Sequence, residues 1–237
     1  MLPFYIEQYD QLDSTNTFAK LRISQGTVRP YCVIMCRHQS KGRGTKDHTW
    51  VSLDGNIFMS IVMPLYKGWT SEELSTTAGI GVARMVEQIV NNSAETNATQ
   101  PIVSIKSPND VLINGKKVSG VLIEIESRAP TASVSGKQNP LSEINECASD
   151  EFAGNEYDKN GPTVNKYAGN ERATSEYTGN RHATNEFAII GIGINLVASP
   201  GNMEATYLQK YSPYITHEYA TKTLLREISS VFEPLLQ

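Results

Sequence analysis

The sequence has little of several features that would place it in a class at once. Its longest apolar stretches, residues 120–125 and 188–197, are far shorter than the roughly 20 residues of a membrane-spanning helix. Its first ten residues contain neither the basic nor the apolar segment of a secretory signal peptide. Neither sign of charge dominates, since 21 Lys and Arg oppose 25 Asp and Glu in 237 residues. We therefore expect no membrane association and no general DNA- or RNA-binding surface, although a local basic patch stays open.

Cysteine and histidine are also scarce. The three cysteines are odd in number and too few for a disulfide framework in a chain of this length. Cys32 and Cys36 lie in an apolar segment, where a strand would place both on one face but too far apart to bond, so we expect buried thiols. The four histidines show no ligand spacing with them, so no metal site built from side chains is expected. A reducing cytoplasm fits this cysteine usage.

Hydrophobic patterning predicts strands and helices in alternation along the first half of the chain, and one more of each near its end. Apolar side chains recur at helical spacing in two long segments, whereas β-branched and apolar residues form short strand-like runs. The predicted helices cover 15–24, 71–90 and 219–236, and the predicted strands cover 4–12, 31–37, 56–63, 103–106, 111–113, 117–125 and 187–196.

Local signals mark several ends of these elements. Ser14 or Thr15 can cap the first helix, and Gly26 can take the position just after it. Asn114 and Gly115 are the strongest short signal for a tight hairpin turn, here between two predicted strands.

Residues 127–186 differ from the rest of the chain. They are rich in Asn, Thr, Ser, Glu and Gly, and part of the segment repeats every ten residues, with repeats beginning at Tyr157, Tyr167 and Tyr177. Stacked repeats need an apolar face, and one aromatic residue in ten is too little. We expect a polar, mobile insertion or a long solvated β-hairpin extension between two neighbouring strands.

Two polar stretches beside apolar strands are candidates for chemistry. Residues 13–16 fit an ordinary helix cap, but hydroxyls and an amide at a helix N-terminus also suit a polar or anionic ligand. In the loop 39–46, glycines let backbone N–H groups approach a ligand, and Lys41, Arg43 and Lys46 would attract phosphate or carboxylate. The loop matches neither common nucleotide-binding glycine pattern, so a solvated surface loop is the alternative.

A third stretch brings two lysines together. Lys106 follows an apolar strand and Lys117 starts another strand across a tight turn. The alternative is an ordinary hairpin with lysines at its mouth. Gly120, inside a strand, indicates close approach of backbone or ligand.

Five motifs in one order resemble the catalytic domain of biotin protein ligases, the biotin–[acetyl-CoA-carboxylase] ligases. Outside the insertion the resemblance covers nearly the whole chain. The motifs are STN (14–16), QxxGRG with a following Trp (Gln39, Gly42, Arg43, Gly44, Trp50), KxPND (Lys106, Pro108, Asn109, Asp110), KxxGxLxE (Lys117, Gly120, Leu122, Glu124) and GxGIN (Gly191, Gly193, Ile194, Asn195).

This resemblance implies a fold and a reaction. The fold is α+β, a mixed β-sheet flanked by helices like the class II aminoacyl-tRNA synthetase core, with which the predicted elements agree. The biotin carboxylate attacks the α-phosphate of ATP, usually with Mg²⁺, to give biotinyl-5′-AMP and pyrophosphate. A lysine of a biotin carboxyl carrier domain then takes the biotin and releases AMP. Cations and oriented N–H groups would screen the reacting anions.

The resemblance also implies roles for individual residues. Lys117, Arg43 and Lys106 would be the catalytic cations, and no side chain would act as nucleophile. The biotin site would comprise Ser14, Thr15, Asn16, Gln39, Gly42, Arg43, Gly44, Thr45, Lys117 and Gly120. The ATP and adenylate site would comprise Arg43, Trp50, Lys106, Asn109, Lys117 and Asn195.

The chain departs from the family pattern in two motifs. Thr45, Asp47 and His48 stand where relatives usually carry Arg, Gly and Arg, and Ser107 replaces a Trp. Fewer guanidinium groups predict weaker retention of the adenylate.

The domain expectation is one catalytic domain over 1–237, with the insertion at about 127–186. We expect neither an N-terminal DNA-binding helix-turn-helix nor a C-terminal small β-barrel, and so no DNA partner; the oligomeric state stays open between monomer and homodimer. Two functional alternatives stay open: a lipoate–protein ligase, and a non-catalytic relative that binds a cofactor.

Overall fold

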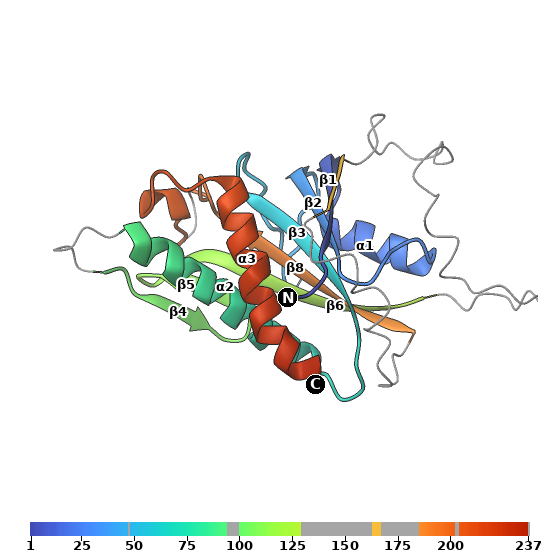
Figure 1. The fold of residues 1–237 in the computed structure, drawn as a ribbon. Helices are drawn as coiled ribbons and strands as arrows, with labels where there is room; N and C mark the ends of the chain where they lie inside the picture. Colours follow the sequence, from blue (N-terminus) through green and yellow to red (C-terminus); the bar gives the residue numbers. More distant parts are fainter. Residues whose placement is uncertain (47, 94–99, 129–162, 167–184, 202–203, 237) are drawn as a thin grey trace, which may run out of the picture.

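One eight-stranded mixed sheet organises the computed structural model, which describes residues 1–46, 48–93, 100–128, 163–166, 185–201 and 204–236 (Figure 1). Its strand order is β4-β5-β6-β8-β3-β2-β1-β7, and only β1 and β2 pair in parallel. The strands are β1 (Tyr5–Leu12), β2 (Cys32–Gln39), β3 (Ile57–Pro64), β4 (Val103–Lys106), β5 (Asp110–Ile113), β6 (Lys116–Ser127), β7 (Thr163–Lys166) and β8 (Glu186–Ile194).

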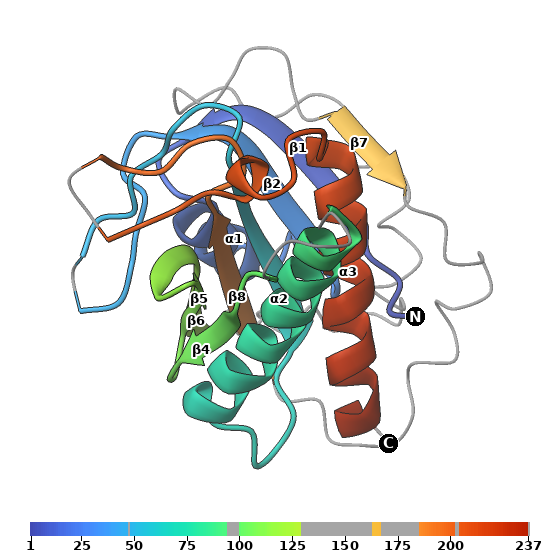
Figure 2. The same ribbon diagram turned by 90° about the vertical axis from the view of Figure 1, so that its left-hand side faces the viewer.

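Helices cover both faces of the sheet. α2 (Ser71–Ser93) and α3 (His217–Phe232) lie side by side on one face, and α1 (Thr15–Ser24) packs on the other (Figure 2). Strand β3 shows why two cores form, because its alternate side chains point to opposite faces. Met59 and Ile61 are buried with α2 and α3, whereas Phe58 and Val62 are buried with α1. The α+β fold with a mixed sheet flanked by helices is therefore confirmed.

Short signals in the sequence placed several boundaries correctly. Ser14 caps α1 and accepts a hydrogen bond from the backbone N–H of Thr17, and Gly26 follows the helix with φ of 71°. Asn114 and Gly115 both have positive φ, 49° and 76°, as the tight turn between β5 and β6 requires. Cys32 and Cys36 are buried, and burial raises the pKa of Cys36 to about 12.

The last helix is shorter than expected. Helix α3 begins at His217 and ends at Phe232, and a 3₁₀ turn (Glu233–Leu236) follows. Pro234 explains the change, since proline has no N–H for the helical hydrogen bond and its ring crowds the preceding turn. Strand β2 also ends two residues later than the predicted strand 31–37, because it continues through His38 and Gln39.

The polar insertion joins two paired strands, as expected. The β6–β8 register runs from Ser119 opposite Ile194 to Ser127 opposite Glu186. One segment of the insertion differs from the expectation: β7 pairs antiparallel with β1 and extends the sheet. The predicted repeats otherwise lie outside the described residues. Within the described part of the chain, no helix is long and apolar enough to cross a membrane.

Candidate active site

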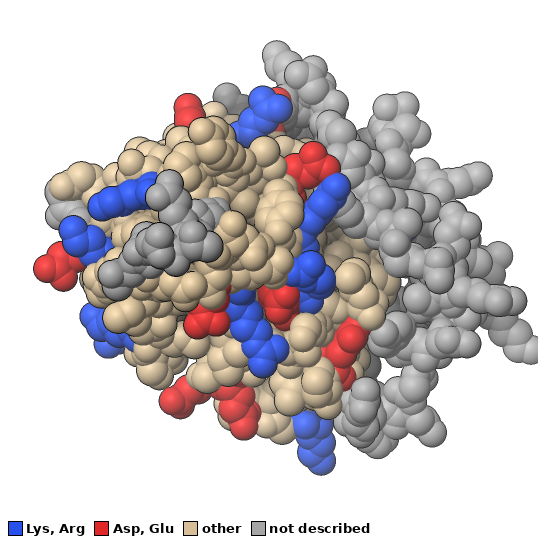
Figure 3. All heavy atoms as spheres, turned by 60° about the vertical axis from the view of Figure 1, so that its left-hand side comes forward, with Lys and Arg blue, Asp and Glu red and all other residues tan. Residues whose placement is uncertain are grey.

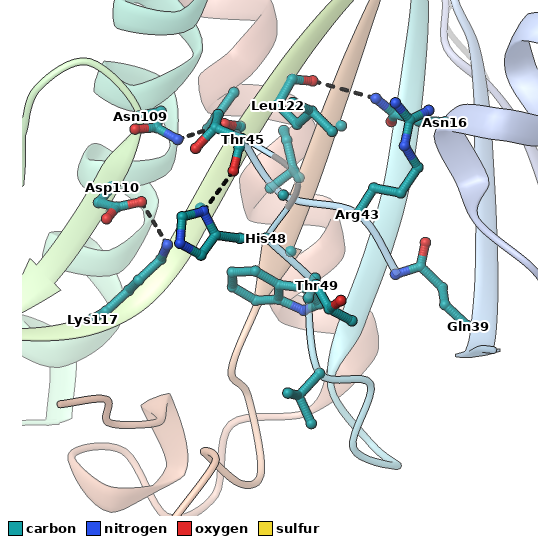
Figure 4. Close-up of a pocket in the computed structure, with 18 of the residues that line it drawn as sticks. Asn16, Gln39, Arg43, Thr45, His48, Thr49, Asn109, Asp110, Lys117 and Leu122 are labelled. Carbon is teal, nitrogen blue, oxygen red and sulfur yellow. Dashed lines mark hydrogen bonds and ion pairs between the residues drawn. The ribbon is translucent and has the colours of Figure 1, made fainter. Parts of the chain in front are cut away.

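Residues of all three polar stretches, which lie apart in the sequence, line one cavity of about 420 Å³ (Figure 4). It is bounded by the N-terminus of α1, the glycine loop after β2, the β4–β5 turn, and the segment after β8. Every predicted site residue except Gly42 lines it. Those residues are Ser14, Thr15, Asn16, Gln39, Arg43, Gly44, Thr45, Trp50, Lys106, Asn109, Lys117, Gly120 and Asn195.

A hydrogen-bonded polar floor lies at the first turn of α1. The Ser60 hydroxyl, on β3, lies 2.8 Å from Thr15 Oγ1 and 2.5 Å from Asn16 Oδ1. Gln39 Oε1 accepts the backbone N–H of Thr15 at 3.0 Å. A methyl group at Gly191 would overlap the Asn16 amide, so glycine is required there. Ser60 was not predicted, although a lone hydroxyl in an otherwise apolar strand was a signal for it.

The glycine loop forms a short hairpin beside the cavity. Gly44 N–H donates to His48 O at 2.7 Å, and Trp50 N–H donates to Gly42 O at 3.0 Å. Gly42 is the one predicted residue that the structure places elsewhere. A side chain at Gly42 would meet the Trp50 carbonyl. The residue lines an adjoining hollow, which shares Arg43 and Gly44 with the cavity. Its backbone packs across the hairpin, and its contact with a ligand stays a prediction.

Arg43 does not extend freely into the cavity that it lines. Its two terminal nitrogens donate to Glu124 at 3.1 and 2.9 Å, and Lys20 Nζ lies 2.6 Å from the same carboxylate. Burial alone would raise the pKa of Glu124, but hydrogen bonds from Lys20 and Asn16 and the charge of Arg43 lower it below its usual range. Glu124 was noted only as part of a motif, and Lys20 was missed.

The two predicted lysines line the same cavity in different settings. Lys117 Nζ lies 2.6 Å from Asp110 Oδ1, and the Lys117 N–H donates to Glu204 O at 3.0 Å, which fixes its backbone. Lys106, at the exposed end of β4, forms no ion pair within the described residues. Of the two lysines, Lys117 is therefore ion-paired and Lys106 has no ion-pair partner among the residues that the structure describes. Asp110 was not predicted as a site residue.

Trp50 lies flat on two glycines of the sheet. Gly120 and Gly193 are opposite each other in the β6–β8 ladder. A methyl group would come within 2.9 Å of the indole at Gly120 and 2.5 Å at Gly193. The sequence predicted close approach of backbone or ligand at Gly120; the structure shows the Trp50 side chain there, and Gly120 also lines the cavity. The indole Nε1 is buried without a hydrogen-bond partner, which leaves a donor at the cavity wall.

The two asparagines predicted for the ATP site hold backbone around the cavity. Asn109 Nδ2 donates to Val121 O at 3.2 Å, and Asn195 Nδ2 donates to Thr206 O at 3.1 Å. Their amide groups therefore shape the walls. No cluster of three or more His, Cys, Asp or Glu side chains suited to a metal ion occurs among the residues described.

Comparison with known proteins gives a family and a fold. The sequence model of the biotin/lipoate A/B protein ligase family matches residues 9–135. A bifunctional ligase/repressor BirA of Bacillus subtilis is 29% identical over 124 residues, which are 50% of this chain and 34% of that protein. A biotin–[acetyl-CoA-carboxylase] ligase of Paracoccus denitrificans is 31% identical over 119 residues, which are 50% of this chain and 46% of that protein. The matched regions thus span less than half of these relatives.

Solved structures share the fold over nearly the whole chain. The biotin protein ligase of Aquifex aeolicus, in complex with biotin and ATP, superposes with a TM-score of 0.62 at 20% identity, over 97% of this chain and 71% of that one. The Leishmania major biotin protein ligase, in complex with biotinyl-5-AMP, gives a TM-score of 0.60 at 19% identity, over 99% of this chain and 79% of that one.

Proposed function

The chain belongs to the biotin/lipoate A/B protein ligase family, and from this membership we propose that it adenylates biotin with ATP and transfers the biotin to a lysine of a carrier protein. The carrier would be a biotin carboxyl carrier domain of the acetyl-CoA carboxylase type. One observation carries the proposal: a single cavity combines a buried polar floor with three cations, Arg43, Lys106 and Lys117.

The polar floor would bind the ureido ring of biotin. Ser14, Thr15 and Asn16 are buried. Thr15 is hydrogen-bonded to Gln39 and Ser60, and Asn16 to Ser60, so these groups are held in place before a ligand arrives. A ring that both donates and accepts hydrogen bonds suits hydroxyl and amide groups held in this way. The biotin carboxylate would then point toward Lys117.

The cations would screen two anions that must meet. An attacking carboxylate and the α-phosphate repel each other, and cations already in place stabilise the charge that develops between them. Lys117 stands at the carboxylate, Lys106 at the phosphates and Arg43 at the adenylate. Biotin oxygen gains the bond to phosphorus, and pyrophosphate leaves. The carrier lysine then attacks the acyl carbon, and AMP leaves with the electron pair.

ATP would lie between Trp50 and the β4–β5 turn. Trp50 offers an unpartnered Nε1–H, and Asn109 and Asn195 hold the walls of that part of the cavity. Mg²⁺ would accompany ATP, chiefly on phosphate oxygens, because Asp110 is the one acidic side chain among the described lining residues. When bound, it supplies further neutralisation of the phosphates.

Ligand-dependent thermal stability tests this assignment of substrates. A ligand that binds only the folded protein raises the melting temperature. We expect biotin to stabilise the protein and biotin with MgATP to stabilise it further, with lipoate giving no shift. Stabilisation by lipoate alone would favour lipoate–protein ligase activity, which the family also includes. No shift with either acid would favour a relative without this activity.

A further inference from the structure

Three basic or polar groups from two separate elements converge on one carboxylate next to the cavity. Glu124, on β6, accepts hydrogen bonds from both terminal nitrogens of Arg43 and from Asn16 Nδ2 at 3.0 Å. Its carboxylate also forms an ion pair with Lys20 Nζ at 2.6 Å. Asn16 and Lys20 lie one turn apart on α1, so the helix presents both to Glu124. The Glu124 side chain is only 12% exposed. The described cavity lining includes Arg43 but neither Glu124 nor Lys20.

The charges in this cluster are unequal. One carboxylate faces two cations, so the cluster carries an excess positive charge. If Arg43 leaves, Glu124 keeps Lys20 and Asn16, and no unpaired carboxylate stays behind in a half-buried position. The cost of breaking a buried pair arises mainly from the partner left alone. Arg43, whose side chain is 42% exposed on a glycine loop, is also the partner that can move most easily.

We propose that Glu124 and Lys20 are positioning residues that hold Arg43 beside the cavity and release it to an incoming anion. This inference rests on the proposed function for the identity of the anion, which is the carboxylate of biotin or the phosphate of ATP. Lys20 is essential because it takes over the charge of Glu124 when Arg43 departs. Without Lys20, Arg43 becomes the only cation on that carboxylate and is held more tightly.

The two positioning residues therefore predict opposite effects. Lys20→Met leaves Arg43 bound to Glu124 and weakens anion binding, roughly threefold or more for one partly exposed pair. Glu124→Gln frees both cations and strengthens anion binding by a similar factor. Lys20→Arg restores wild-type behaviour because it keeps the charge. Lys222→Met is the matched control, since Lys222 is also ion-paired but lies on α3.

Equilibrium binding and proteolysis measure the hold of Glu124 on Arg43 without any catalytic step. Calorimetry compares biotin with biotinol, its neutral alcohol, so that only the anionic contribution changes between variants. Trypsin cleavage after Arg43 reports release of the side chain, without ligand, with biotin and with ATP. The biotin and ATP arms show which anion takes Arg43. We expect faster cleavage in Glu124→Gln and slower cleavage in Lys20→Met.

Several outcomes would overturn the proposal. They are a change in the same direction for both variants, wild-type cleavage in Glu124→Gln, or an equal effect in Lys222→Met. If Glu124→Gln does not fold, Lys20→Met and Lys20→Arg still decide the question. Failure of the proposed function looks different: neither biotin nor ATP binds the wild type, while cleavage without ligand still follows the order given above.

Discussion

Trp50 is the residue whose position depends most directly on the absence of other side chains. Its indole rests on Gly193, where a methyl group would lie 2.5 Å from Cε2. We expect Gly193→Ala to displace the ring and destabilise the protein by about 1–3 kcal/mol, the usual cost of overpacking. The fluorescence of Trp50 measures the displacement in a Trp69→Phe background, because the chain has two tryptophans. Gly201→Ala is the control, since that methyl group would meet nothing within 4 Å. Unchanged emission in Gly193→Ala would contradict this packing.

Thr45 lines the cavity, at a position where the family resemblance implies an arginine. A guanidinium there would add a charge-assisted hydrogen bond to the adenylate phosphate, worth about 1.5–3 kcal/mol. We expect Thr45→Arg to slow release of labelled biotinyl-5′-AMP in the absence of carrier, by roughly ten- to a hundredfold. The dissociation rate checks this directly. A rate equal to that of the wild type would show that residue 45 does not reach the phosphate.

Glu124 predicts a pH dependence of stability. Its pKa in the folded protein is lowered, as described above, while the unfolded chain has the ordinary value of about 4.3. The carboxylate therefore stabilises the fold fully above about pH 5, and this contribution disappears as the pH falls below 4.3 toward the folded pKa. Urea unfolding of the wild type and Glu124→Gln should differ in free energy at pH 7, and the difference should shrink as the pH falls below about 4.3. A constant difference between them would contradict the lowered pKa.

At the scale of elements, β7 is the part of the polar insertion that joins the sheet. It pairs with β1 on the edge opposite β4 and adds four residues of backbone hydrogen bonding. We expect deletion of residues 129–184 to lower the melting temperature but to leave biotin binding intact, because the described cavity lining contains no residue of this segment. Deletion of 129–156 keeps β7 and is the control. Loss of biotin binding in the larger deletion alone would show that β7 supports the site.

Elements with a local signal could be predicted, as could the pairing of the strands on either side of the insertion, but the pairing of β7 with β1 could not. The cap at Ser14 and the turn at Asn114 follow from residue type alone, so both were placed from the sequence. Strand β7 has only four residues and no clear alternation, and it forms because the open edge of β1 accepts it. Helix α3 ends early because of Pro234, a local signal that the long apolar pattern concealed.

The same division applies to the site. The motifs placed Arg43 and Lys117 at the cavity correctly, since glycine loops and turns can be identified locally. Their ion pairs could not be predicted, because Glu124 lies 81 residues from Arg43 and meets it only in the folded sheet. The hollow that Gly42 lines could not be predicted either, because the sequence does not show which face of a hairpin a residue takes.

At the scale of the whole molecule, three cationic side chains line one cavity of a protein whose positive and negative charges nearly balance. Lysine and arginine side chains alternate with acidic ones on the face shown in Figure 3, in keeping with the net charge of −4. Binding of anions therefore depends on the cavity rather than on a general attraction to the surface. The effect of removing Lys117 on the reaction therefore tests the proposed function better than a change in the net charge of the protein would.

The most direct test is biotin-dependent exchange of labelled pyrophosphate into ATP, which reports formation of the adenylate without a carrier. The account predicts exchange with biotin and none with lipoate. It predicts loss of at least about a hundredfold in Lys117→Ala, since one charge-stabilising group contributes that much. The adjacent exposed lysine, as Lys116→Ala, is the control and should retain exchange. Absence of biotin-dependent exchange in the folded wild type, or full exchange in Lys117→Ala, would contradict the account.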